Sequence, residues 1–175
     1  MTLGFRRTWG GSIVIDLDPE EATVLRSMAN LVLSLVDPPE PKDELAELVG
    51  IGEQREAPDD PVLARLFPDA YSQDEESAGD FRRYTEDGLR SEKRAAAESI
   101  IEVVPESGGR IELDDEQGLT WMKSLNDVRL ALGTRIGIQQ DTGRPPQDAS
   151  MEDWAAVNIY DWLTALQDSL VRAVR

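Results

Sequence analysis

The side chains that could do chemistry in this chain are carboxylates and arginines, because its 175 residues include no histidine and no cysteine. Histidine is the usual proton carrier near neutral pH, and histidine and cysteine are the usual ligands of zinc. Their absence excludes Ser-His-Asp triads, thiol nucleophiles and zinc-activated water. We therefore assign no catalytic residue, no metal ligand and no cofactor, and we expect a protein that is not an enzyme.

Three acidic motifs are the remaining candidates for chemistry. Residues 141–143 form the Asp-Thr-Gly tripeptide of aspartic proteases, but no apolar strand leads into them. The clusters at residues 74–76 and 114–116 could bind Mg²⁺ or Ca²⁺ through oxygen atoms, yet neither has the EF-hand spacing. Both clusters stand where a helix would begin, and acidic first turns stabilise helices, so we interpret them as helix starts. A pair of carboxylates with glycosidase-type chemistry stays open as a weaker alternative.

Arginines form one stripe on an otherwise acidic chain. Arg83, Arg90 and Arg94 fall on the same side of a long polar helix. This stripe could be a basic contact surface for a partner. The alternative, which we favour, is a solvated face balanced by Glu86 and Asp87.

A second candidate contact lies in an acidic, proline-rich segment at about residues 37–61, which we expect to be a flexible linker. Leu45 and Leu48 could line one side of a short helix that docks onto a partner. A solvated loop is the alternative, and it is the one we favour.

Polar residues beside the apolar stripes of the last two helices predict a structural pair. Asn126 and Arg129 flank the stripe of the penultimate helix, and Asp161 flanks that of the last helix. We predict that Arg129 or Arg135 pairs with Asp161 across the interface and fixes the helix register. Gly133, one turn after Arg129, would permit close approach of the neighbouring helix.

The elements that position these residues are mainly helices with a small antiparallel sheet, an α+β arrangement with an N-terminal β-hairpin and about four helices. Residues 5–9 and 13–17 flank Gly10-Gly11, which predicts the hairpin, and residues 110–113 predict a third strand. Helices are predicted to begin after Asp18, Asp114 and Ser150, which have good N-cap chemistry. The sparse inner side of the long polar helix, at about residues 75–103, is expected to comprise Phe81, Tyr84, Gly88, Ala95 and Ile100.

Length and charge limit the partners. One domain is expected over residues 1–175, and 35 acidic against 18 basic residues leave a net charge of −17. This charge repels phosphate backbones and anionic lipids, so we expect a protein partner rather than nucleic acid or a membrane. The longest apolar stretch, residues 31–36, is too short to cross a bilayer and no leader is evident, so we expect a cytoplasmic protein. A homodimer through the helices of Trp121 and Trp154 is a further hypothesis.

Three stretches of the chain carry a family resemblance. They are residues 125–137 (LNDVRLALGTRIG), residues 160–163 (YDWL) and residues 5–7 (FRR). The chain resembles, over its whole length, the AosR-like family of small acidic bacterial proteins, formerly a domain of unknown function and now described as oxidative-stress transcriptional regulators.

The resemblance implies a regulator that senses oxidant through a cysteine pair and contacts a sigma factor. Without cysteine, this chain cannot carry a thiol–disulfide switch of its own. We therefore expect a non-enzymatic regulatory protein in stress-responsive transcription, which binds a sigma factor or another transcription protein with a basic surface. The alternative is an adaptor or scaffold in protein turnover or another pathway.

Overall fold

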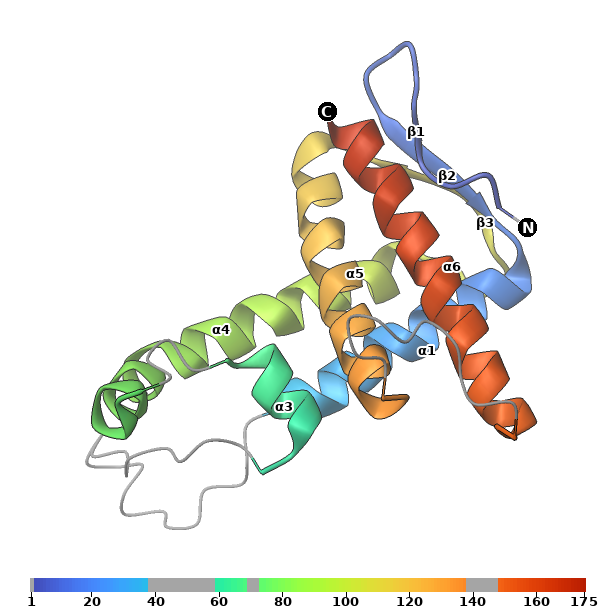
Figure 1. The fold of residues 1–175 in the computed structure, drawn as a ribbon. Coiled ribbons are helices and arrows are strands. Elements are labelled where there is room, and N and C mark those ends of the chain that lie inside the picture. Colours follow the sequence, from blue (N-terminus) through green and yellow to red (C-terminus); the bar gives the residue numbers. More distant parts are fainter. Residues whose placement is uncertain (1, 38–58, 69–72, 138–147) are drawn as a thin grey trace.

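The computed structural model describes residues 2–37, 59–68, 73–137 and 148–175 (Figure 1). These residues form a mainly helical fold with a small sheet, as predicted, although they contain five helices where we expected about four. Leu45, Leu48 and most of the proline-rich segment lie outside the described residues, as does the Asp-Thr-Gly motif. The elements, in chain order, are β1 (Arg6–Arg7), β2 (Ile13–Leu17), α1 (Pro19–Val36), α3 (Pro61–Leu66), α4 (Glu75–Val103), β3 (Gly109–Leu113), α5 (Asp115–Arg135) and α6 (Met151–Val174).

The sheet has three antiparallel strands in the order β1-β2-β3. Ile13 of β2 lies opposite Leu113 of β3, and Ile15 lies opposite Ile111. Since alternate side chains of a strand point to the same face, these four residues cover one face of the sheet, and all four are buried in the core. The predicted hairpin and third strand are confirmed.

Three helices begin at the predicted N-caps. The side chains of Asp18, Asp114 and Ser150 accept hydrogen bonds from the backbone N–H three residues later, and each forms a complete capping box. At the start of α4, the Asp74 side chain accepts hydrogen bonds from the Ser77 hydroxyl and the Ser77 backbone N–H. These hydrogen bonds lower the pKa of Asp74. The acidic clusters at residues 74–76 and 114–116 are thus helix starts, as we interpreted them.

The core lies where α5 and α6 pack side by side beneath the sheet, with α1 and α4 crossing them (Figure 1). Trp121 of α5 is completely buried and meets the Phe5 ring edge-on, with 6.0 Å between ring centroids. The Trp121 side chain is therefore part of the core, and the hypothesis of a homodimer through the helices of Trp121 and Trp154 stays a hypothesis. Within the described part of the chain, every helix is too short or too polar to cross a membrane.

The inner side of α4 differs from the prediction. Ile100 is completely buried as expected, but Phe81 is 40% exposed and Tyr84 is 74% exposed. The stripe that faces the other helices comprises Ala78, Arg82, Glu86, Arg90, Ala97 and Ile100. Charged side chains occupy positions that hydrophobicity alone assigns to solvent, because neighbouring elements supply partners for them.

Candidate functional site

Arg90 is the centre of a buried ionic contact between α4 and the end of α1. Its Nε and Nη2 atoms donate to Glu86 Oε1 at 2.9 and 2.7 Å, and Nη1 donates to the carbonyl oxygens of Val36 and Asp37, both at 3.2 Å. The guanidinium also lies 4.6 Å from the centroid of the Phe67 ring, a cation–π distance. Since α1 has no basic residue in its last turn, Arg90 supplies the positive charge that a helix C-terminus favours.

Arg90 is only 8% exposed, so it belongs neither to a basic contact surface nor to the solvated face that we favoured. The pairing with Glu86 that we expected on a solvated face does form, but in the interior. Arg94 is about half exposed and forms ion pairs with Asp37 at 2.6 Å and Glu98 at 3.4 Å. The side chain of Arg83 lies outside what the structure describes.

A second buried ion pair joins α4 to α5. Lys93 Nζ donates to Asp127 Oδ1 at 2.6 Å, and the Asp127 side chain is only 6% exposed. Burial raises the pKa of Asp127, because removal from water disfavours the charged carboxylate; the hydrogen bond and positive charge of Lys93 act in the opposite direction. The pair fixes the two helices relative to each other, and we did not predict it.

Arg129 joins α5 to α6, but not through the predicted partner. Its guanidinium donates to Thr164 Oγ1 at 3.0 Å and to Gln167 Oε1, and it lies 5.3 Å from the centroid of the Tyr160 ring. Asp161 is exposed, and among the described residues no ion pair connects it to an arginine.

The predicted pair with Asp161 is wrong because of helix geometry. Thr164 and Gln167 follow Tyr160 at intervals of four and three residues and share its face, whereas Asp161 is turned about 100° away. The other two residues of the prediction, Arg135 and Asn126, are also exposed. The close approach expected at Gly133 is confirmed, since a Cβ atom there would lie 3.0 Å from the Tyr160 ring.

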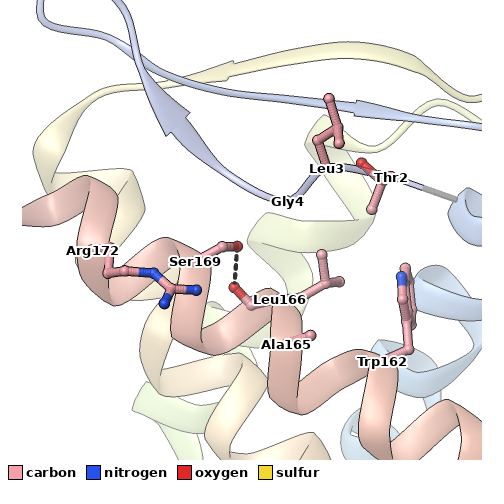
Figure 2. Close-up of a pocket in the computed structure, with 8 residues that line it drawn as sticks. All are labelled: Thr2, Leu3, Gly4, Trp162, Ala165, Leu166, Ser169 and Arg172. Carbon is pink, nitrogen blue, oxygen red and sulfur yellow. Dashed lines mark hydrogen bonds between the residues drawn. The ribbon is translucent and has the colours of Figure 1, made fainter.

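A groove of about 160 Å³ lies between the N-terminal segment and α6 (Figure 2). Gly4 has a positive φ of 80°, and a Cβ atom on it would come within 2.7 Å of Ser169, so glycine allows the segment to approach the helix this closely. Phe5 N donates to Ser169 Oγ at 2.9 Å, and Ser169 in turn donates to the Leu166 carbonyl. Of the eight lining residues only Arg172 is charged, so the groove offers no acid–base pair. Its lining residues are Thr2, Leu3, Gly4, Trp162, Ala165, Leu166, Ser169 and Arg172.

Large apolar side chains are exposed at several places on the described surface. Trp9, at the turn between β1 and β2, is as exposed as in an extended chain, at 108%. Leu119 in the second turn of α5 is 48% exposed, and Trp154 in the first turn of α6 is 39% exposed. Such side chains are candidates for contacts with another protein. Within the described residues, the acidic side chains form no group of three or more that could hold a metal ion.

Comparison with known proteins places the chain in a family. Residues 2–174 match the family described as Domain of unknown function (DUF2017). The chain belongs to the DUF2017 family.

Relatives of this DUF2017 chain carry a functional name. Over 173 residues it is 35% identical to the oxidative stress regulator AosR of Mycobacterium tuberculosis (strain H37Rv), covering 89% of this chain and 78% of the relative. It is 32% identical over 174 residues to the putative oxidative stress regulator AosR of Mycobacterium leprae, covering 89% of this chain and 79% of the relative. The AosR-like resemblance is thereby confirmed. No solved structure matches the chain.

In this DUF2017 member, the structure brings together residues that the sequence analysis did not connect. Arg90 contacts Phe67 and the carbonyl oxygens at the end of α1, and Lys93 contacts Asp127, so these charges hold helices together. The exposure of Trp9 was also not predicted. The two glycines that follow Trp9 in the sequence could have predicted its exposure, because a tight turn leaves no neighbouring element to cover a large side chain.

Proposed function

We propose that this chain is a non-enzymatic regulatory protein of the oxidative-stress response and acts by binding a sigma factor or another transcription protein. The observation that carries the proposal is the similarity, over 89% of the chain, to proteins named oxidative stress regulator AosR. Because the chain contains no cysteine, its part in the response does not rest on a thiol switch of its own.

The distribution of charge supports a partner with a basic surface. Several positive side chains are used inside the protein: Arg90 and Lys93 hold α4, and Arg26 donates to the carbonyl oxygens of Ile101 and Val104, both at 2.6 Å. With a net charge of −17 and these cations turned inward, the outer surface is dominated by carboxylates. Such a surface attracts a basic protein and speeds its approach, most strongly at low salt.

A direct binding measurement tests this function. The purified chain is titrated into each purified sigma factor of its own organism and into the RNA polymerase holoenzyme, at about 50 mM and about 500 mM salt. We expect saturable binding to one of them at low salt and markedly weaker binding at high salt, since salt screens surface charges. The same titration after peroxide treatment of either component shows which of the two responds to oxidant.

Two results would contradict the proposal. One is no binding to any sigma factor or to the polymerase at either salt concentration. The other is specific binding to a component of the proteolysis machinery alone, which would favour the adaptor function instead.

A further inference from the structure

The exposure of Trp9 is unusual for this protein. Tryptophan is its largest apolar side chain, and the other three differ clearly from Trp9: Trp121 is completely buried, Trp162 is partly buried and Trp154 is 39% exposed. Trp9 is 108% exposed, so no described part of the chain covers its indole ring. Because the indole has the largest apolar surface of any side chain, its transfer from water into an apolar pocket on another protein is the most favourable in free energy.

The backbone that carries Trp9 is held in place. Thr8 N donates to the Ser12 carbonyl at 2.8 Å, and Gly11 N donates to the Thr8 carbonyl at 3.0 Å. Gly11 has a positive φ of 91°, a conformation that suits glycine and closes the turn tightly. The indole is thus presented on an ordered turn, which reduces the entropy lost when a partner binds.

Arg7 fixes this turn to the rest of the molecule. Its guanidinium donates to the Gly11 carbonyl within the turn, to the Ala173 carbonyl near the end of α6, and to Asp115 at the start of α5. The hairpin turn, the start of α5 and the end of α6 therefore lie at one end of the protein (Figure 1). Arg7 and Asp115 form an ion pair at 2.7 Å, so each neutralises the charge of the other.

The start of α5 adds acidic and apolar groups beside the turn. Asp115 and Glu116 are exposed in its first turn, and Leu119 follows Asp115 by four residues, so both lie on the same side of the helix. We name Trp9, Asp115, Glu116 and Leu119 the hairpin-tip surface. It combines two exposed apolar side chains with two carboxylates, of which that of Asp115 is paired with Arg7.

The charge and apolar character of the hairpin-tip surface indicate which kind of partner it can bind. A second copy of the chain would bring another net charge of −17 against it, and anionic lipids or nucleic acids would be repelled in the same way. A pocket that is apolar at its centre and lined at its rim by lysine and arginine matches both parts of the surface. Tryptophan is also among the residues that most often dominate the binding energy of an interface.

We propose that Trp9 is the anchor by which this protein docks onto its protein partner, with the indole entering an apolar pocket whose rim is basic. This inference rests on the proposed function, because it names the surface that contacts the transcription protein. The carboxylate of Glu116, for which the described residues provide no ion pair, faces the basic rim, and Leu119 extends the apolar contact.

The test compares Trp9→Ala with Trp154→Ala in the sigma-factor and polymerase titrations described above. Both variants remove an exposed indole, but Trp154 lies at the start of α6, away from the hairpin. We expect Trp9→Ala to weaken binding by about tenfold or more and Trp154→Ala to change it by less than about twofold. Trp9→Ala should melt at the same temperature as the unchanged protein, since its indole is fully exposed, and Trp154→Ala should melt slightly lower, since its indole is 39% exposed.

Tryptophan emission supplies an independent measurement. For a partner stripped of its own tryptophans, binding should shift the emission to shorter wavelength as the Trp9 indole leaves water, and Trp9→Ala should abolish this shift. Unchanged affinity of Trp9→Ala would overturn the docking surface while the proposed function stands. Absence of binding by the unchanged protein would overturn both. Self-association that Trp9→Ala abolishes would also overturn the inference, by making the occupant a second copy.

Discussion

Two parts of α4 are buried by different means. In the C-terminal part, Ala97 and Ile100 are completely buried among apolar neighbours. Near the middle of the helix, Glu86 and Arg90 are buried almost as completely, at 5% and 8% exposure, although both are charged. One helix therefore uses hydrophobic packing towards its C-terminus and an ionic contact at its centre.

The difference shows what each part of α4 requires of its neighbours. An apolar stripe accepts any surface of complementary shape, and its stabilisation scales with the area removed from water. A buried charge requires a particular partner at hydrogen-bond distance, because otherwise the free-energy cost of removing the charge from water exceeds the gain from its interactions. The central part of α4 is therefore the part whose position depends on individual atoms, such as the carbonyl oxygens at the end of α1.

The largest effect is expected in the apolar C-terminal part of α4. Ile100→Ala removes completely buried methyl groups and leaves a cavity, which should lower the free energy of unfolding by about 3 kcal/mol. Urea denaturation followed by circular dichroism measures the change. A loss below about 1 kcal/mol would mean that this part of α4 can collapse around the cavity, and the contrast with the charged central part would weaken.

The next largest effect is expected from breaking the pair between Lys93 and Asp127. Lys93→Met keeps the stem but leaves the Asp127 carboxylate buried without its cation, which should cost about 2 kcal/mol at neutral pH. The double variant Lys93→Met, Asp127→Asn should recover part of this loss, since it removes the uncompensated charge. If the loss in the double variant, measured by urea denaturation, equals the sum of the losses in Lys93→Met and Asp127→Asn, the two side chains are not coupled.

A smaller effect is expected when the guanidinium of Arg90 is replaced by an ammonium group of the same charge. Arg90→Lys cannot hold Glu86 and both α1 carbonyls at once, so we expect a loss of about 1 to 2 kcal/mol. Arg94→Lys is the matched control on the same helix, and because this side chain is half exposed its effect should stay within about 0.5 kcal/mol. Similar losses in the two variants would argue against a special role of the buried contact.

The smallest effect concerns the pH dependence that Asp127 confers. Burial raises its pKa in the folded protein above the ordinary value of 3.8, so the folded state holds the proton more tightly than the unfolded state does. The contribution of Asp127 to stability is therefore fully present below the unfolded pKa and is lost as the pH rises through the raised, folded pKa.

The comparison with Asp127→Asn isolates this contribution. The free energy of unfolding of the unchanged protein, relative to that of the variant, should fall as the pH increases from about 3.5 towards neutrality. Urea denaturation at a series of pH values provides the measurement. A relative stability that rises over this range would mean that the attraction of Lys93 outweighs the desolvation of the carboxylate.

Features determined by short stretches of sequence were predictable. The hairpin follows from two glycines between β-rich runs, and the helix starts follow from N-cap residues such as Asp18 and Ser150. An apolar stripe on the penultimate helix was also expected, and the apolar residues Leu125 and Val128 of α5 are completely buried.

The buried charges were not predictable in the same way. Glu86 and Arg90 have the spacing of an exposed stabilising pair, and nothing in α4 itself shows that Phe67 and the end of α1 cover them. The partner of Arg129 was missed for a related reason. We predicted Asp161 as the partner of Arg129 because of its charge. The rotation of α6 instead brings the neutral Thr164 into contact with Arg129.

The hydrogen bond from Phe5 to Ser169 spans 164 positions of the chain, and Arg7 reaches equally far to the end of α6. Synthesis on the ribosome proceeds from the N-terminus, so the hairpin emerges long before the helix that supports it. A two-stranded hairpin has little stability alone, and β3 and α6 arrive only after most of the chain has been made. The end of the protein that carries Trp9 should therefore be among the last parts to acquire its native structure during translation, and nascent chains truncated before α6 should present that tryptophan on an unstructured segment.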